Sequence, residues 1–578
     1  MHCLKYGLTV HNLLQVDIVT LEGERLSLGS SALDSAGFDL LALFTGSEGL
    51  LGVVVEVTVR LLPRSPVAKV LLASFDDVES AGRAVADLIG AGIVPAGLEM
   101  MDNLSIRAAE DFIHAGYPVD AAAILLCELD GVEADVHEDC ERVRELFEAA
   151  GATSVRQAQD EAERQRFWAG RKNAFPAVGR ISPDYYCMDG SIPRRELPRV
   201  LHGIAELSRE YGLRVANVFH AGDGNMHPLI LFDANLAGEL ERAEALGGRI
   251  LELCVAVGGS ITGEHGVGRE KINQMCAQFN ADELTLFHAV KAAFDPARAA
   301  QSRQERAHPA SLRRVRRHAR PPRSTAVPRT GAFLMSQPYF DPDAGADHAG
   351  ALLERVRDAL ARRAPLRIVG GDSKAFLGRP VAGEPLALAE HRGIVAYDPC
   401  ELVITARAGT PLDELQAVLA RGGQMLACEA PGFGGRATVG GVLASGLSGP
   451  RRPWAGAVRD FVLGTRLISG LGTHLRFGGE VMKNVAGYDL SRLLAGSFGC
   501  LGVVTEVSFQ GAAHAALPGR PEPGPAGGDG VAQTGRVGRP AIADQCGLPR
   551  RRSPALAPGG RRGLGTLGTR PPRWRSAR

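Results

Sequence analysis

The sequence of 578 residues lacks several features that would assign it to a specialised class of protein. Its ten cysteines include no Cys-x-x-Cys pair, which argues against a zinc ribbon or an iron–sulfur ligand run and favours a reducing compartment. No apolar run reaches the roughly 18 residues that suggest a membrane-spanning helix, and the first residues do not have the pattern of a signal peptide. We therefore expect a cytoplasmic protein without a membrane span.

Net charge is also lacking, since 65 Lys and Arg balance 65 Asp and Glu, but the positive charge is unevenly placed. Residues 297–330 contain ten Arg and one Glu, and residues 511–578 contain twelve Arg and three acidic residues. Both segments are poor in apolar residues, so we expect a disordered basic linker at 298–334 and a disordered tail at 511–578. Nucleic-acid binding is the alternative, but aromatic residues for stacking are not interleaved, so we expect no nucleic-acid partner. Out-of-frame translation would also explain both segments.

The chain contains one segment twice. Residues 43–57 (LFTGSEGLLGVVVEV) and 493–507 (LLAGSFGCLGVVTEV) are identical at ten of fifteen positions, at an offset of 450. The match extends upstream, where Gly-Phe-Asp-Leu at 37–40 corresponds to Gly-Tyr-Asp-Leu at 487–490. An offset this long is not the period of a solenoid, which is 20–50 residues. The sequence therefore predicts two copies of one domain type.

Hydrophobic periodicity predicts the strands and helices between and around the two copies. Residues 67–297 alternate strand-like runs such as KVLLASF and HPLILF with amphipathic helices at 134–151 and 237–258. This pattern predicts an α+β domain whose antiparallel sheet is covered by helices. We expect three folded parts, at residues 1–66, 67–297 and 335–510.

Three glycine-containing loops occur in the last of these parts. They are GGDSK at 370–374, which follows a strand, ATVGGVLASG at 437–446, and GSFG at 496–499, which precedes a Val-rich strand. Glycines let the backbone approach a phosphate closely, and successive N–H groups form an anion-binding nest. Each loop alone is a weak signal, but the three in this order favour a site for a large flat ligand that carries phosphate.

With these loops the chain resembles the FAD-linked oxidases of the vanillyl-alcohol oxidase (PCMH-type) superfamily. The resemblance implies an α+β protein with a PCMH-type two-subdomain FAD-binding fold, near-complete at 335–510 and partial at 1–66. Residues 67–297 would be the α+β cap, the FAD-linked oxidase C-terminal domain. The two halves look like a C-terminal portion of a D-type glycolate oxidase subunit and an N-terminal portion of an E-type one. No histidine for covalent attachment is evident, so non-covalent FAD is expected.

The resemblance also implies which residues bind the cofactor. In the near-complete copy these are Gly370, Gly371, Asp372, Ser373, Lys374, Thr438, Gly440, Gly441, Ser445, Gly496, Ser497, Gly499 and Val504. In the partial copy they are Gly46, Ser47, Glu48 and Gly49, without a pyrophosphate loop. We do not expect this half site to hold FAD by itself.

A second set of candidate residues lies in the cap. His220 and His227 flank a Gly-Asp-Gly-Asn turn between two apolar runs. On one straight strand a separation of seven would put the rings on opposite faces, but the turn lets the chain reverse so that they converge. With Glu264 they suit a divalent metal that keeps an open position, and the adjacent His265 suits a base. The alternatives are a chance spacing without a metal and a metal-dependent hydrolase, which leaves the repeat unexplained.

In the relatives, the residues that match His220, His227 and Glu264 hold a divalent metal, which would be Zn, Mn or Fe. The resemblance also makes His265 the base, and it pairs Arg171 with the substrate carboxylate. In this chemistry the metal polarises the α-hydroxyl, His265 takes its proton, and hydride passes from Cα to the flavin. Without the resemblance, Arg171 would be interpreted as a solvated helix residue.

Two departures from the relatives bear on the substrate. Cys187 stands where some relatives have a lysine near the substrate, and Leu229 stands where the 2-hydroxyglutarate enzymes have an asparagine. Both differences favour a small hydroxy acid over a dicarboxylate.

We therefore predict FAD-dependent oxidation of a small D-2-hydroxy acid, glycolate to glyoxylate, with electrons passed to a separate acceptor. Because the chain has no cysteine ligand run, the predicted acceptor is an iron–sulfur partner subunit. The rival prediction is a catalytically incomplete flavin-binding or assembly protein, since the partial flavin module lacks its phosphate loop and the near-complete one lacks a cap. Whether the 370–374 subdomain completes the first module's site stays open.

Overall fold

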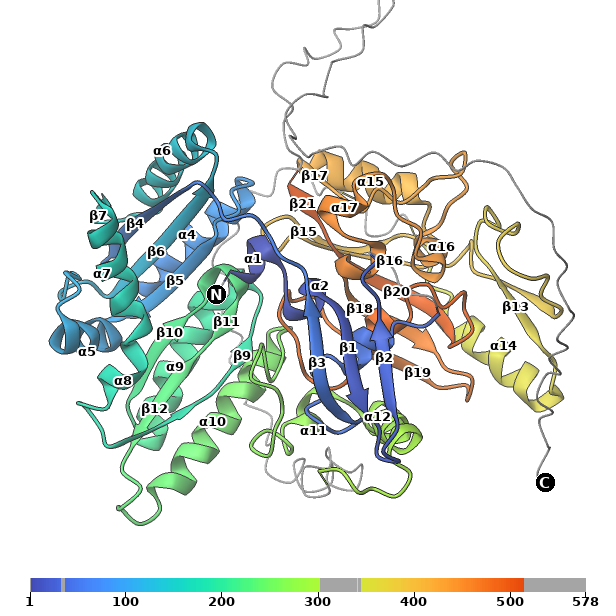
Figure 1. Cartoon of the computed structure of the whole chain (residues 1–578), viewed down its shortest axis with the longest axis horizontal. Coiled ribbons are helices and arrows are strands. Elements are labelled where there is room, and N and C mark those ends of the chain that lie inside the picture. The colour runs from blue at the N-terminus through green and yellow to red at the C-terminus, as the bar shows by residue number, and fades with distance from the viewer. Residues whose placement is uncertain (1, 33–36, 302–339, 341–344, 514–578) are drawn as a thin grey trace, which may run out of the picture. The chain divides into compact units, whose positions relative to one another are not determined.

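Alternating strands and helices fill the computed structural model, which describes residues 2–32, 37–301, 340 and 345–513 (Figure 1). The described residues belong to one unit, Met1–Ala515. The predicted basic linker beyond residue 301 and the predicted tail beyond residue 513 lie outside the described residues. Among the described helices, none has both the length and the apolar character that crossing a membrane requires.

The cap is built on a seven-stranded sheet with the order β7-β4-β6-β5-β10-β12-β8. Every neighbouring pair in it is antiparallel. Its strands are β4 (Val67–Phe75), β5 (Gly97–Asp102), β6 (Ala123–Gly131), β7 (Ser154–Gln157), β8 (Asp184–Cys187), β10 (Val215–Phe219) and β12 (Pro228–Phe232). The short strands β9 (Gly190–Ser191) and β11 (Asn225–Met226) pair separately.

Helices cover both faces of this sheet. The helices of this part of the chain are α4 (Val78–Gly90), α5 (Asn103–Ile113), α6 (Glu133–Ala149), α7 (Glu161–Lys172), α8 (Ala174–Val178), α9 (Leu197–Tyr211), α10 (Glu239–Ala256), α11 (Met275–Gln278) and α12 (Ala281–Phe294), with 3₁₀ turns η1 (Arg194–Glu196) and η2 (Ala221–Asp223). Alternate residues of β4 enter different cores, Leu71 and Phe75 on one side and Val70 and Leu72 on the other. This period of two leaves both faces of the sheet covered, and it confirms the predicted α+β class.

The second module contains a five-stranded antiparallel sheet with the order β15-β16-β20-β18-β19. The sheet consists of β15 (Ile394–Asp398), β16 (Val403–Arg407), β18 (Val462–Ile468), β19 (His474–Gly478) and β20 (Val503–Gln510). Two further pairs of strands are β13 (Leu366–Val369) with β14 (Glu384–Ala387), and β17 (Gln424–Met425) with β21 (Ala512–Ala513). Its helices are α14 (Ala349–Arg362), α15 (Leu412–Arg421), α16 (Val439–Ser445), α17 (Arg452–Ala455), η4 (Val458–Phe461) and α18 (Leu490–Leu493).

The first module is a smaller sheet with the order β2-β1-β3. Its elements are α1 (Cys3–Tyr6), α2 (Thr9–Asn12), β1 (Leu13–Val19), β2 (Arg25–Gly29), α3 (Leu40–Phe44) and β3 (Val53–Val59). The order matches β19-β18-β20 of the second module, and Asp39 and Asp489 cap the equivalent helices α3 and α18 through their side chains. The two sequence copies therefore share a local fold.

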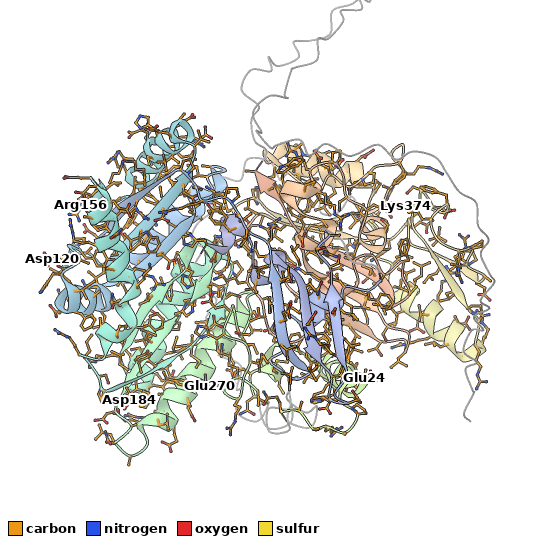
Figure 2. All side chains as sticks on the ribbon, in the orientation of Figure 1. Glu24, Asp120, Arg156, Asp184, Glu270 and Lys374 are labelled. Carbon is orange, nitrogen blue, oxygen red and sulfur yellow. The ribbon has the colours of Figure 1, made fainter. Side chains whose placement is uncertain are left out.

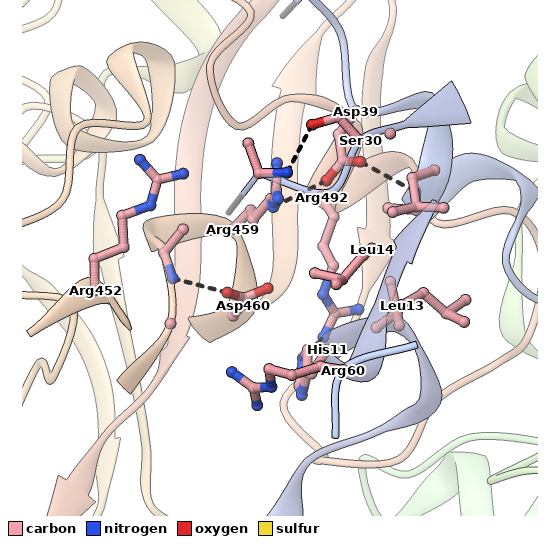
Figure 3. Close-up of a pocket in the computed structure, with 17 residues that line it drawn as sticks. His11, Leu13, Leu14, Ser30, Asp39, Arg60, Arg452, Arg459, Asp460 and Arg492 are labelled. Carbon is pink, nitrogen blue, oxygen red and sulfur yellow. Dashed lines mark hydrogen bonds and ion pairs between the residues drawn. The ribbon is translucent and has the colours of Figure 1, made fainter. Parts of the chain in front are cut away.

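The two copies contact each other through these equivalent helices. A cavity of about 50 Å³ between them is lined by arginines that approach from both copies (Figure 3). Arg459 pairs with Asp39 at 3.4 Å, and Arg492 Nη2 lies 3.2 Å from His11 Nε2. Burial and the nearby Arg492 charge lower the pKa of His11 to about 3. A neutral imidazole is the form that tolerates this cationic surrounding.

Candidate active site

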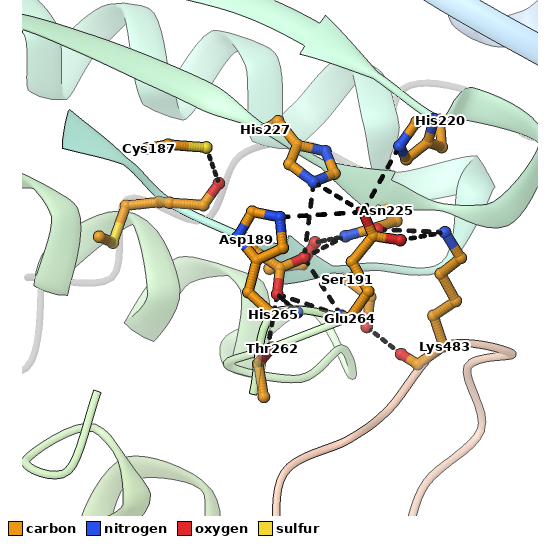
Figure 4. Close-up of polar contacts among 12 residues, drawn as sticks. Cys187, Asp189, Ser191, His220, Asn225, His227, Thr262, Glu264, His265 and Lys483 are labelled. Carbon is orange, nitrogen blue, oxygen red and sulfur yellow. Dashed lines mark hydrogen bonds and ion pairs between the residues drawn. The ribbon is translucent and has the colours of Figure 1, made fainter. Parts of the chain in front are cut away.

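The turn between β10 and β12 brings the two predicted metal histidines together. His220 pairs with Asn225 in an isolated bridge, so the chain reverses within the turn, and the two imidazole rings lie 4.9 Å apart. Glu264 reaches them from the loop before α11 (Figure 4). Its Oε1 is 3.2 Å from His227 Nε2 and 3.6 Å from His220 Nε2. The convergence expected from the Gly-Asp-Gly-Asn turn is thus present in the structure.

A buried carboxylate orients His220 from behind. Nδ1 of His220 lies 2.8 Å from Glu99, which is 1% exposed and pairs with Arg171 at 2.7 Å. Burial would raise the pKa of Glu99, but the Arg171 and His220 charges hold it well below its usual value. Burial would likewise lower the pKa of His220, yet Glu99 raises it. With a carboxylate on Nδ1, the Nε2 atom faces Glu264, an arrangement typical of metal-binding histidines.

His227 is more deeply buried than His220, since 2% of its side chain is exposed against 13%. Burial lowers its pKa, so the imidazole is neutral near pH 7, which is the state that binds a metal ion. Its Nδ1 is buried and has no hydrogen-bond partner among the described residues. Ligand atoms of His220, His227 and Glu264 all lie within 4.8 Å of one another, and Asp189, His227 and His265 form a second such group. These donors fit a divalent cation with nitrogen and oxygen ligands.

Asp189 organises the loop that carries Glu264 and His265, and the sequence analysis missed it. Its fully buried carboxylate accepts the backbone N–H groups of Glu264 at 3.1 Å and His265 at 2.8 Å. It also accepts hydrogen bonds from Thr262 Oγ1 and from Lys271 Nζ. Burial would raise the pKa of Asp189, but the Lys271 charge holds it below the usual range. Only its place in an apolar run distinguishes it in the sequence, which is too weak a signal.

Lys483 of the second module reaches the same cluster and was also missed. Its Nζ lies 2.9 Å from Glu264 Oε2, 3.0 Å from Asp223 Oδ2 and 3.2 Å from Asn225 Oδ1. The side chain is 1% exposed. No motif in the sequence connects position 483 with a turn more than 250 residues earlier, so only the tertiary structure reveals this contact.

A cavity of about 700 Å³ opens beside the cluster. All three parts of the chain line it: Gly46 and Glu48 of the first module, Glu264 and His265 of the cap, and residues 483–492 of the second module. His265 is half exposed there, with its ring 5.0 Å from that of His227. The position of His265 suits a group that exchanges protons with a bound molecule.

The other predicted substrate residues do not line this cavity. The Arg171 side chain is 7% exposed and directed at Glu99 and His220, which gives it a part in orienting His220. Its predicted pairing with a substrate carboxylate stays a prediction. Cys187 is directed at the carbonyl oxygen of Met188, and burial raises the pKa of its thiol to about 12. Leu229 is fully buried in the cap core.

The three glycine-containing loops of the second module converge. A Cβ added at Gly371 would overlap the carbonyl oxygen of Arg436, and one at Gly370 would overlap Thr438 Oγ1. The third loop joins them through N–H groups of Gly496 and Phe498, which donate to carbonyl oxygens at the C-terminal end of α16. The three loops therefore meet through their backbones, at places where a Cβ atom would not fit.

Individual side chains of these loops have distinct environments. Lys374 lies in the loop after β13, with Nζ 5.1 Å from the Phe433 ring centre, and burial lowers its pKa (Figure 2). Thr438 caps α16, and Ser373, Ser497 and Val504 are buried. The remaining predicted contacts, Asp372, Gly440, Gly441, Ser445 and Gly499, belong to the same loops.

The first module uses its equivalent loop differently. The Glu48 carboxylate accepts the N–H groups of Val267 and Gly268, each at 2.8 Å, and so holds the loop after His265. Ser47 is buried, and Gly46 and Gly49 have positive φ angles. This half site therefore contacts the cap.

Comparisons with known proteins agree with the two kinds of domain. Residues 64–300 match the family described as "FAD linked oxidases, C-terminal domain", and residues 344–478 match the "FAD binding domain" family. Over 296 residues the chain is 80% identical to "Glycolate oxidase subunit GlcD" of Escherichia coli strain K12, covering 51% of this chain and 59% of that protein.

Two further relatives match the same portions. Over 164 residues the chain is 65% identical to "Glycolate oxidase subunit GlcE" of Escherichia coli strain K12, covering 28% of this chain and 47% of that protein. Over 294 residues it is 36% identical to "Glycolate oxidase subunit GlcD" of Bacillus subtilis strain 168, covering 51% of this chain and 63% of that protein. The chain thus spans about three-fifths of each GlcD protein and about half of the GlcE protein. The chain therefore contains domains of two FAD-linked oxidase families, as a portion similar to GlcD followed by a portion similar to GlcE.

Proposed function

We propose that the chain oxidises a small D-2-hydroxy acid in an FAD-dependent reaction, with glycolate as the substrate and glyoxylate as the product. The observation that carries this proposal is the shared cavity of about 700 Å³, where the cap's Glu264 and His265 face residues 483–492 of the flavin-type module. The relatives of the two portions are both named as glycolate oxidase components, which supports the choice of substrate.

Each part of the proposed reaction is assigned to particular residues of this chain. His265 takes the proton of the substrate hydroxyl, because it is the half-exposed group beside the cluster. His220, His227 and Glu264 would hold a divalent metal, which supplies a Lewis acid for that hydroxyl when bound. Residues of the three converging loops would hold FAD, which supplies the acceptor for the hydride of Cα when bound. Asp189 keeps His265 in place through the backbone.

We also propose that the electrons leave through a separate iron–sulfur protein of the same assembly. The nine described cysteines are all unpaired and scattered, and the sequence offers no ligand run for a cluster of its own. Both relatives are subunits by name, which supports a multi-subunit assembly. The rival proposal is a flavin-binding or assembly protein without turnover, and it is supported by the first module's Glu48, whose carboxylate is engaged by the cap loop.

An absorbance spectrum of the purified chain, followed by anaerobic addition of glycolate or D-lactate, separates these proposals. A flavin spectrum that bleaches on addition supports oxidation and means that cap and second module cooperate. Bound flavin that never bleaches would favour the binding or assembly role, and no flavin at all would contradict both.

Two variants test the assignments within this experiment. His265→Asn should retain flavin but slow bleaching by about 10²- to 10⁴-fold, the usual contribution of a positioned base. Lys374→Met should instead lower flavin content and leave the rate per bound flavin unchanged. Equal bleaching rates in His265→Asn and wild type would exclude His265 as the base.

A further inference from the structure

We infer that Lys483 is a positioning residue, supplied by the second module, that sets the geometry of the His220–His227–Glu264 cluster in the cap. This inference rests on the proposed function, since it concerns the metal-binding residues of that site. It makes the second module part of the cluster's framework in addition to its predicted role in holding FAD.

The ammonium group of Lys483 has three hydrogens, and three acceptors surround it. These are Glu264 Oε2 at 2.9 Å, Asp223 Oδ2 at 3.0 Å and Asn225 Oδ1 at 3.2 Å. Nζ donates hydrogen bonds to Glu264 and Asn225 and forms an ion pair with Asp223, so all three contacts are made to residues of the cap. Its role is therefore to hold other residues in place.

The three acceptors belong to two different segments of the cap. Asp223 and Asn225 lie in the turn between His220 and His227, whereas Glu264 lies in the loop that follows Thr262. Lys483 thus joins the segment that carries both histidines to the segment that carries the carboxylate. By engaging Oε2 of Glu264, it leaves Oε1 directed at the two Nε2 atoms.

Lys483 and its acidic partners lie away from solvent. The side chain of Lys483 is 1% exposed, that of Asp223 is 3% exposed and that of Glu264 is 17% exposed. A buried ammonium needs such partners, and its removal would leave the buried Asp223 carboxylate without this opposite charge.

The segment around Lys483 is docked on the cap by its backbone and by the Asn484 side chain. Asn484 Oδ1 accepts from Ser260 Oγ at 2.8 Å, and Val485 N–H donates to the carbonyl oxygen of Thr262 at 3.3 Å. Ser191 Oγ donates to the carbonyl oxygen of Lys483. Docking of the second module and assembly of the cluster are therefore coupled.

The first module has no equivalent charge. At the repeat offset of 450, position 483 corresponds to Leu33, whose side chain has no charge. Only the second copy of the repeat carries a lysine at this position, so the cap depends on the second module for this contact.

Titration calorimetry of the full chain with MnCl₂ tests the inference. Lys483→Met removes the ammonium while keeping an unbranched side chain, and it should weaken Mn²⁺ binding by about 10- to 100-fold, as loss of an outer partner of a metal ligand typically does. The matched control, Lys69→Met, alters an exposed lysine on β4 and should leave the affinity unchanged. Circular dichroism establishes that both variants are folded.

If Lys483→Met does not fold, the double variant Lys483→Met/Asp223→Asn replaces it, because it removes one positive and one negative charge together. Affinity within twofold of wild type in the folded variant overturns the inference and leaves the proposed function standing. Failure of the wild-type protein to bind Mn²⁺ overturns the metal role and this inference together. Bleaching by glycolate in wild type tests the oxidation itself separately.

Discussion

The two copies of the repeat are identical at ten of fifteen positions and share a local fold, yet they differ sharply in burial. Val57 in β3 is 49% exposed, whereas its counterpart Val507 in β20 is fully buried. Val53 and Val503 differ in the same way, at 57% and 5%. The turns before these strands agree closely, since Glu48 and Phe498 have φ angles of 57° and 53°.

The reason lies in the neighbours of each strand. β20 lies between β16 and β18, and Val503 packs in a core with residues of α14 and β14. β3 pairs with β1 on one side, and no described strand pairs with its other edge. Identical residues therefore contribute to a core in one copy and form an exposed apolar strand in the other. Local sequence sets conformation, and surrounding elements set stability.

The largest difference between the copies is expected for a charge placed in each strand. Val507→Asp puts an uncompensated carboxylate in a core and should destabilise the second module by about 3–5 kcal/mol. Val57→Asp changes an exposed position and should stay within about 0.5 kcal/mol of wild type. Urea denaturation followed by circular dichroism measures both, and equal losses would contradict the difference in burial.

A smaller difference is expected at the turn before the strand. Glu48→Ala removes a carboxylate that accepts two backbone N–H groups of the cap and should cost about 1.5–3 kcal/mol. Phe498→Ala changes a side chain that is 58% exposed and should be nearly neutral. The same denaturation series compares them, with Glu48→Gln as the variant that keeps the shape. A neutral Glu48→Ala would show that the first module does not support the His265 loop.

The helix caps should behave alike in the two copies. Asp39→Ala and Asp489→Ala each remove a side chain that accepts a backbone N–H at the start of a short helix. Each should cost about 1 kcal/mol, the usual value for such a cap. Asn at either position should restore most of the loss, because its side-chain oxygen also accepts. A much larger cost at one position would mean that its arginine partner matters more than the cap.

The smallest effect on stability, but a clear effect on association, is expected for the exposed strand. Val55→Lys and Val57→Lys together place two positive charges on an apolar edge strand. Natural proteins use such charges to prevent edge strands of two molecules from pairing. Unfolding should change by less than about 0.5 kcal/mol, while light scattering at high protein concentration should fall. The matched control is Glu24→Lys, an exposed change in the turn between β1 and β2. Unchanged scattering in the Val variants would show that the strand does not drive association.

Much of the fold followed from local patterns. Strand-like apolar runs predicted β4 and β12, and helical spacing predicted α6 and α10, because each of these elements buries one face or both against a core. Strands such as β5, β18 and β19 were not predicted, since glycines and charged residues interrupt their apolar runs. The order of the strands in each sheet could not be predicted from the sequence, because it depends on pairing between distant segments.

The residues of the candidate site also fall into those that the sequence predicted and those that only the structure revealed. His220, His227, Glu264 and His265 could be chosen from the sequence because their residue types and the turn between the histidines suggest a metal and a base. Asp189, Glu99 and Lys483 could not, although they hold those residues in place, because nothing local distinguishes a carboxylate or ammonium that will be buried.

The sequence by itself determined the repeat, the glycine-containing loops and the composition of the cluster, since these are properties of adjacent residues and of backbone freedom. Only the tertiary structure decided that β20 is buried and β3 exposed, and that a lysine of the second module reaches the cap's histidine turn. Burial and ion pairing depend on which distant segments meet. That is a property of the packed chain as a whole, because desolvation and charge compensation act between neighbours in space.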